Sequence, residues 1–206
     1  HFDKALVRPL VTQALPLAMT AFLGGTMLTV DMLMLGYLRT ATEVGLYSAV
    51  QKIIQVAYSL AGIAGISLFS SFSRLYVKDH ARFKELFKEA FRVMSIGSAA
   101  FALLGIIFAG PILAFIYGNA YVGGITAFRL LAATFFLLAP TEIGIHALLA
   151  AGKQKVFLYS APIGAISNAL LNALFIPYWG ITGAALSTLM TQVTVNAYLW
   201  KKIREL

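Results

Sequence analysis

Four ionisable side chains that could handle charge lie well inside long apolar stretches of this sequence: Asp31, Lys52, Glu142 and His146, whereas Arg129 lies near the end of its stretch. A carboxylate can take up a proton or a small cation, an imidazole can relay a proton, and a lysine ammonium can neutralise an anion such as a phosphate. If the apolar stretches lie in a bilayer, each of these groups needs a partner, a cavity or water, because a charge in lipid is costly. The four residues are therefore the first candidates for a site that handles charge.

Asp31 and Lys52 are predicted to lie at the same depth. Counted at 1.5 Å per residue along helices at 12–38 and 44–72, Asp31 lies roughly 10 Å and Lys52 roughly 12 Å below the same surface. Two interpretations are open. The pair forms an ion pair between neighbouring antiparallel helices, or Lys52 binds an anionic substrate while Asp31 binds a coupling cation.

Both of these helices carry a semi-polar face. Steps of three and four residues connect one set of residues on each helix. The sets are Ser48, Gln51, Lys52, Gln55, Ser59 and Gly62, and Gln13, Pro16, Thr20, Gly24, Met27 and Asp31. Two such faces on adjacent helices predict the walls of an aqueous cavity, in which Lys52, Gln51 and Gln55 contact substrate.

Two further polar pairs follow the same i, i+4 spacing. Glu142 and His146 share one helix face, either as a mutually satisfied pair or as a proton or cation relay. Asn168 and Asn172 share a face with small residues, which indicates either tight helix packing closed by amide hydrogen bonds or contacts to substrate.

The elements that position these residues follow from composition. The 206 residues are 60% hydrophobic and only 12% charged, with a mean hydropathy of +0.83. These proportions exclude an ordinary water-soluble domain. Six apolar stretches are each long enough to cross a bilayer, at 12–38, 44–72, 90–117, 125–151, 156–176 and 181–200. Lipid requires internally satisfied backbone, so the predicted fold is an all-α, polytopic membrane protein with one six-helix lobe over 1–206.

The net charge of +8 is explained by topology rather than by nucleic acid. Thirteen of the sixteen basic residues fall before the first span, between spans two and three, between four and five, or after six. Only Arg39 lies in a connection on the opposite side. The positive-inside rule then predicts a cytoplasmic-membrane protein with both termini in the cytoplasm.

The long basic connection at 73–89 is predicted to be helical, because Phe83, Phe87 and Phe91 recur every four residues. It is either a solvated extension of the third span on the lipid headgroups or a surface for a partner.

No enzyme, cofactor or metal site is expected. The sequence has no cysteine, no GxxxxGK loop and no HExxH, and its three histidines are scattered. Asp31 and Glu142 are predicted in opposite leaflets, too far apart for paired acid and base chemistry. The chain begins at His1 rather than Met, and we expect a segment of a longer protein.

Three motifs resemble those of the oligosaccharide flippase branch of the multidrug and polysaccharide exporter superfamily. Asp31, "LGY" at 35–37 and "EVGLYSA" at 43–49 are similar to one family segment. "IYGNAY" at 116–121 is similar to a second. Asn168 and Asn172, followed by Ile176, Pro177, Gly180 and Gly183, resemble a third, although Met32 stands where the family often has a basic residue.

The resemblance implies the C-terminal half of a transporter with two six-helix lobes. It implies translocation of lipid-linked oligosaccharide by alternating access, with membrane lipid, the glycan substrate and a missing N-terminal lobe or second copy as partners. The alternatives are a cation-coupled drug or lipid-precursor exporter of the same superfamily, or a non-transporting scaffold subunit of a polymer-synthesis complex.

Overall fold

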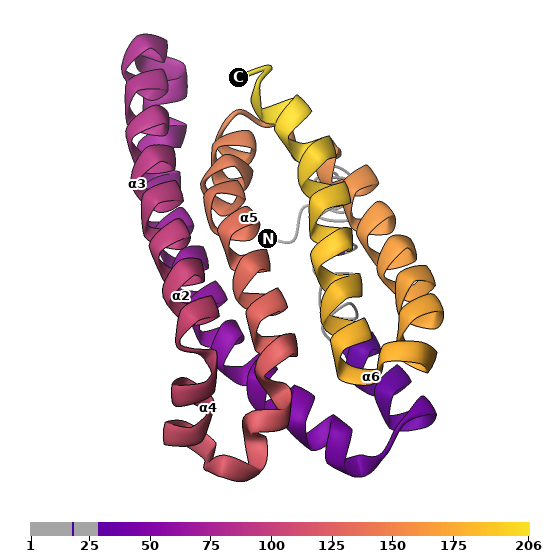
Figure 1. The fold of residues 1–206 in the computed structure, drawn as a ribbon. Helices are drawn as coiled ribbons and strands as arrows, with labels where there is room; N and C mark the ends of the chain where they lie inside the picture. The colour runs from indigo at the N-terminus through magenta and orange to yellow at the C-terminus, as the bar shows by residue number, and fades with distance from the viewer. Residues whose placement is uncertain (1–17, 19–28) are drawn as a thin grey trace, which may run out of the picture.

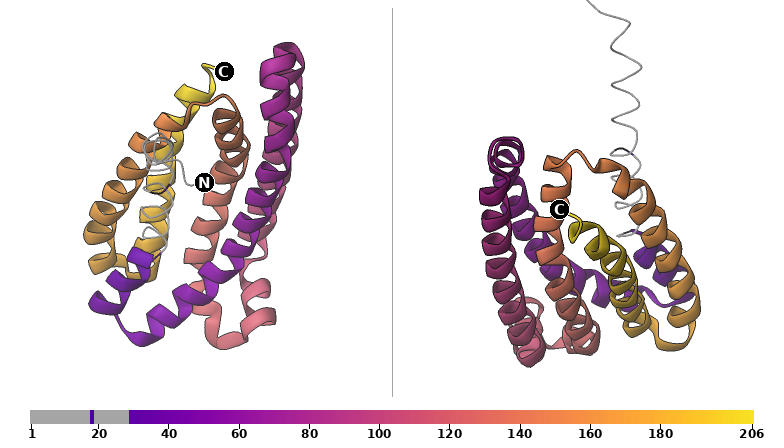
Figure 2. Two further views of the ribbon diagram at one scale, coloured as in Figure 1. Left: turned by 180° about the vertical axis from the view of Figure 1, so that it is seen from behind. Right: turned by 90° about the horizontal axis from the view of Figure 1, so that it is seen from above.

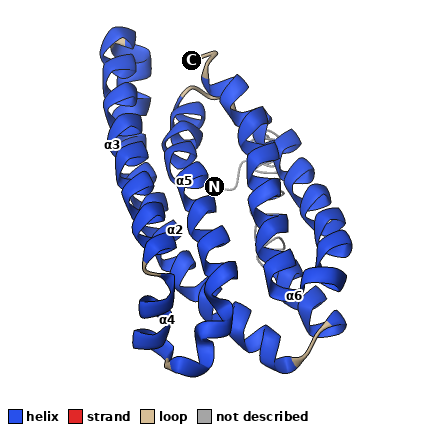
Figure 3. Ribbon diagram, viewed as in Figure 1, coloured by secondary structure: helices blue, strands red, loops and turns tan. Residues whose placement is uncertain are grey.

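The computed structural model describes residue 18 and residues 29–206. These residues form helices joined by short connections, and the described ranges contain no strand (Figure 3). The predicted all-α class is confirmed. The first predicted span, 12–38, is described only as the helix Thr29–Leu38, so most of its polar face lies outside the described residues.

The helices after this first one have the following bounds: α2 Ala41–Lys78, α3 His80–Ile107, α4 Ala109–Tyr117, the 3-10 turn η1 Asn119–Gly124, α5 Ile125–Ala150, the 3-10 turn η2 Gln154–Val156, and α6 Phe157–Ile203. Within the described ranges, four helical stretches are long and apolar enough to cross a membrane. The helix α6 has 47 residues and is interrupted at Gly180, where φ is 53° and ψ is −129°. It therefore forms two antiparallel segments, which correspond to the predicted spans 156–176 and 181–200 (Figure 1).

The prediction of one continuous third span at 90–117 is wrong. The helix α3 ends at Ile107, and the short α4 begins at Ala109. Pro111 gives the physical reason, since it has no N–H to donate to Ile107 and its ring would clash with that carbonyl. In the first turn of α4 the same proline is well tolerated.

The basic connection at 73–89 is helical, as predicted. The helix α2 continues to Lys78 and α3 starts at His80, with the Asp79 carboxylate accepting a hydrogen bond of 3.0 Å from the Arg82 backbone N–H. Phe83 is fully buried against Phe72, and the two ring centroids are 5.6 Å apart. The aromatic face of this connection is thus part of the core.

The connections alternate between the two ends of the bundle. The loop before α2, the turn η1 and the break at Gly180 lie at one end, whereas the α2–α3 junction, η2 and the C-terminus lie at the other (Figure 1). Among described residues, Arg39 is the one basic residue in a connection at the first end. The other described basic residues outside the membrane-spanning parts gather at the second end.

The helix α5 is the centre of the lobe. It packs against α2 and α3 on one side and against α6 on the other (Figure 2). Small residues let these helices approach closely, as at Gly105 of α3, where an added Cβ would lie 3.0 Å from the Ala132 side chain. Away from this packed core, one face of α2 carries exposed apolar side chains, as expected of a surface that faces lipid. Val56 is 63% exposed and Leu60 is 64% exposed.

Candidate functional site

The Asp31 carboxylate is buried, with 3% exposure, and accepts hydrogen bonds from three helix segments. Tyr47 of α2 donates to Oδ2 at 3.0 Å, and Thr188 from the second part of α6 donates to the same oxygen at 2.9 Å. Asn172 from the first part of α6 donates to Oδ1 at 2.5 Å. An ionised carboxylate only accepts hydrogen bonds, so these three neutral donors are suited to hold it.

The first of the two interpretations of Asp31 and Lys52, an ion pair between them, is wrong. Tyr47, not Lys52, is the α2 residue that reaches Asp31. Five residues later on α2, Lys52 is turned roughly 140° away at 100° per residue. Lys52 is exposed and lines a separate groove with Val56. It therefore does not belong to the single polar stripe that we predicted on this helix.

The two asparagines have different surroundings. Asn172 is fully buried and also donates to Asn168 Oδ1 at 3.1 Å. Its own Oδ1 has no hydrogen-bond partner among the described residues. Asn168 is 2% exposed and lines the cavity beside Asp31. The predicted amide hydrogen bonds of this helix face are therefore formed, and they terminate on the carboxylate.

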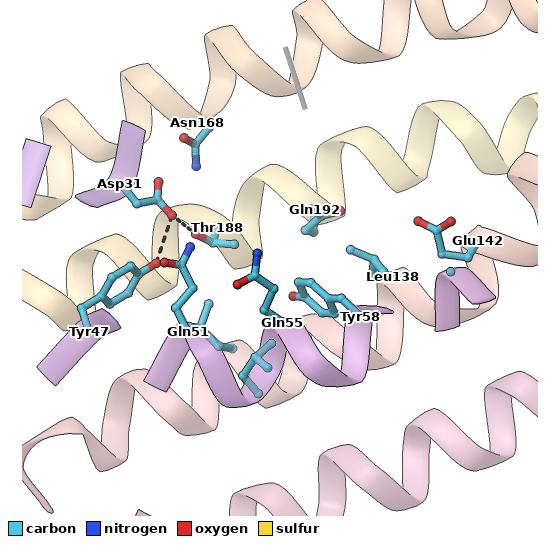
Figure 4. A pocket seen from close by; sticks show the side chains of 13 residues that line it. Asp31, Tyr47, Gln51, Gln55, Tyr58, Leu138, Glu142, Asn168, Thr188 and Gln192 are labelled. Atoms are coloured by element: carbon cyan, nitrogen blue, oxygen red, sulfur yellow. Dashed lines mark hydrogen bonds between the residues drawn. The ribbon is translucent and has the colours of Figure 1, made fainter. Parts of the chain in front are cut away.

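A cavity of about 340 Å³ extends from Asp31 to Glu142 (Figure 4). The two carboxylates lie at its opposite ends, and most of the polar side chains between them come from α2 and α6. Those side chains are Gln51, Gln55, Tyr58, Thr188 and Gln192. Five residues predicted as site residues (Asp31, Gln51, Gln55, Glu142 and Asn168) thus surround one cavity inside the lobe.

The Glu142 and His146 side chains form no hydrogen bond or ion pair with each other. His146 Nδ1 lies 2.9 Å from the backbone oxygen of Glu142, which only accepts hydrogen bonds, so Nδ1 carries the proton. The imidazole fits against α2 at Gly65, where an added Cβ would lie 2.5 Å from Nδ1. The Glu142 side chain instead faces the cavity and also borders a second cavity of about 170 Å³ with Asn196.

A third polar cluster fixes the opposite end of the Asp31 helix. Arg39 donates from Nε to the Ile176 carbonyl at 3.0 Å and from Nη2 to the Pro177 carbonyl at 2.8 Å. At Gly180 an added Cβ would lie 2.4 Å from Glu43 Oε1, and the positive φ also favours glycine. The loop before α2 is thus attached to the break in α6, which helps to place Asp31 beside Asn172.

Tyr47, Thr188 and Arg39 are functional candidates that sequence reasoning missed. Tyr47 lies in the "EVGLYSA" segment but was not assigned a partner, and Thr188 is one of several hydroxyl residues in the span 181–200. For Tyr47 and Thr188 the sequence shows only a polar side chain near the depth of Asp31. Depth alone does not identify a contact.

Comparison with known proteins places this architecture in a family. A family profile described as "Polysaccharide biosynthesis protein" matches residues 1–126, which is more than half of the chain. The chain belongs to the polysaccharide biosynthesis protein family. No curated protein matches it.

Solved structures share the fold of this polysaccharide biosynthesis protein. A multidrug resistance MATE family transporter of the MOP superfamily, in an outward-facing conformation, has a TM-score of 0.81 at 18% identity, covering 95% of this chain and 45% of its own. A MATE protein in the straight conformation has a TM-score of 0.85 at 16% identity, with the same two coverages. A MOP superfamily transporter from Pyrococcus furiosus Vc1 has a TM-score of 0.75 at 21% identity, covering 92% of this chain and 43% of its own.

This polysaccharide biosynthesis protein therefore has the fold of half a MOP-superfamily transporter, and it spans about 45% of the length of such chains. The expected family is confirmed. The third motif of the resemblance, at 168–185, lies beyond the profile match. The structure shows the role of three of its residues. Asn172 binds Asp31, Gly180 forms the break in α6, and Gly183 allows close approach, since its Cβ would lie 2.4 Å from the Phe175 carbonyl oxygen.

Proposed function

We propose that this polysaccharide biosynthesis protein is the C-terminal lobe of a flippase. The flippase moves lipid-linked oligosaccharide or polysaccharide repeat units across the cytoplasmic membrane by alternating access. The observation that carries the proposal is a polar, carboxylate-bearing cavity inside a lobe with the fold of half an exporter, in a family described by polysaccharide biosynthesis.

The size of the cavity indicates that ion binding and glycan passage occur at two different sites. At about 340 Å³ it is at the lower limit of small-molecule pockets, so it suits a cation or proton with water and is too small for an oligosaccharide. The glycan then crosses beside this lobe, in the space that faces a second lobe or a second copy of the chain. The cavity inside the lobe couples that movement to an ion.

Within this division, Asp31 and Glu142 are the ion-binding groups. Asn168 and Asn172 are buried, and their hydrogen bonds are directed to Asp31, which supports a role in holding the carboxylate rather than in touching substrate. Gln55 lines the cavity and is nevertheless exposed, so it can contact both the ion and a glycan outside the lobe. Gln51, one turn earlier, also lines the cavity and is half-buried.

The orientation in the membrane belongs to the same proposal. The end that carries η2, the α2–α3 junction and the C-terminus faces the cytoplasm, since the basic side chains gather there.

One alternative has specific support. Solved structures with this fold include transporters described as multidrug resistance MATE proteins, so a cation-coupled drug or lipid-precursor exporter would use the same lobe. A non-transporting scaffold subunit has less support, because it gives no reason for two carboxylates at the ends of one polar cavity.

The test is complementation of a flippase-deficient strain with the natural chain that contains this sequence. We expect the parent to restore surface polysaccharide, Asp31→Asn to lose the activity at normal protein abundance, and Asp79→Asn to keep it. Asp79 is the matched control, because it caps α3 outside the cavity and asparagine caps equally well. Restored drug resistance without restored polysaccharide would favour the exporter, and full activity of Asp31→Asn would refute the coupling role.

A further inference from the structure

A second concave surface lies on α2 next to the face that lines the cavity. It is an open groove of about 470 Å³, formed by α2 with residues of α3, α4 and α5. Its lining is apolar apart from Lys52 and Tyr117, and includes Val56, Leu60, Phe101 and Phe135. The helix α2 thus separates a polar cavity inside the lobe from an apolar groove on its outer surface.

Lys52 is the charged residue of this groove, and it has no hydrogen bond or ion pair with any described residue. It is the twelfth residue of α2, which places it roughly 16 Å from the start of the helix at 1.5 Å per residue. A cation at that depth in an apolar setting is costly unless an anion or water accompanies it. The groove therefore has an unmatched positive charge at a defined place.

The remainder of the groove has the form of a site for a hydrocarbon chain. Val56 and Leu60 are one helical turn apart and strongly exposed. Phe101 and Phe135 are in ring contact, with centroids 4.7 Å apart, and form a continuous apolar surface between α3 and α5. Scattered apolar residues on a membrane protein simply face lipid, but a slot that also contains an unpaired cation is complementary to a phosphate attached to a long chain.

We propose that this groove binds the lipid carrier of the substrate, with the carrier phosphate at the Lys52 ammonium and the adjoining hydrocarbon along Val56, Leu60 and Phe101. The inference rests on the proposed function and makes it more specific, because it gives the lipid part of the substrate a protein site instead of leaving it in the bulk bilayer. Since Gln51 directly precedes Lys52 on α2, the bound phosphate would hold the attached glycan at the edge of the polar face.

The experiment uses the natural full-length protein in phosphatidylcholine nanodiscs and a polyprenyl phosphate with a photoreactive diazirine on its first isoprene units. We expect labelled peptides to contain Val56 or Leu60. Lys52→Gln should lower labelling about tenfold or more, whereas Lys52→Arg should keep most of it because the charge remains. Lys84→Gln, an exposed lysine far from the groove, should have no effect.

A second pair of variants tests the apolar part of the groove. Leu60→Trp fills the groove and should lower labelling, whereas Leu170→Trp, at an equally exposed position of α6, should not. Labelling that does not depend on Lys52 or Leu60 would overturn the proposal. Equal competition by phosphatidylglycerol would overturn it too, because the site would then be a general one for anionic phospholipids.

The outcome is separable from that of the proposed function. Labelling that depends on Lys52 in a protein unable to complement would support the groove and refute the flippase. Complementation together with labelling that is independent of Lys52 would do the reverse.

Discussion

The hydrogen bond between Asn172 and Asp31 offers the sharpest quantitative test of the site. Asn172 is fully buried, and its Nδ2 is the donor that the described structure gives to Asp31 Oδ1, at 2.5 Å. The substitution Asn172→Leu keeps the volume similar but removes this hydrogen-bond donor from the Asp31 carboxylate. A buried polar group that loses its partner costs about 1–3 kcal/mol, and more if it is charged, so we expect about 3 kcal/mol.

Thermal unfolding of the purified protein in detergent, followed by intrinsic fluorescence, measures this effect. For a chain of this size 1 kcal/mol shifts Tm by roughly 2–4 °C, so Asn172→Leu should lower Tm by roughly 6–12 °C. Asn119→Leu, an exposed asparagine in η1, should change the free energy of unfolding by no more than about 0.5 kcal/mol.

The double change Asp31→Leu with Asn172→Leu provides the decisive comparison. Removal of both partners leaves no stranded carboxylate but leaves the buried Tyr47 hydroxyl without its acceptor, so the double variant should lose less stability than the sum of the two single changes. The reasoning is refuted if Asn172→Leu unfolds within about 2 °C of the parent, which is less than the loss of 1 kcal/mol would give. A double variant whose loss equals the sum of the two singles would refute it as well.

Three further outcomes are expected. Gly180→Ala should cost about 1–3 kcal/mol in thermal unfolding, because φ is 53° there and a side chain is strained; an unchanged Tm would contradict the break in α6. The effects of Asp31→Asn and Lys52→Gln on the free energy of unfolding should add within about 0.5 kcal/mol, since the two residues share no partner, and a compensating double variant would restore the ion pair that we reject. In intact cells a membrane-impermeant thiol reagent should modify Tyr121→Cys but not Lys84→Cys, each as the one cysteine of the chain, and the opposite pattern would reverse the proposed topology.

The sequence by itself determined the class of protein and the order of its helices. Apolar length predicts helices that cross a bilayer, and a bilayer permits little else, so the starts of α2 and α5 and the break before Ile181 could be located to within a few residues. The depth of a side chain in the membrane can also be predicted from the sequence, because it follows from counting residues along a helix axis. The need of Asp31 for partners follows from the cost of a charge in lipid.

Which side chains meet Asp31 was decided only by the tertiary structure. Two of its donors, Asn172 and Thr188, are 141 and 157 residues away in the sequence, and contacts at such separations depend on how α6 turns back at Gly180. The orientation of α2 about its axis places Tyr47 at the Asp31 carboxylate and Lys52 in the groove. Counting residues gives the depth of a side chain in a helix but not the identity of its neighbours, because the rotation of a helix about its axis depends on how it packs against other helices.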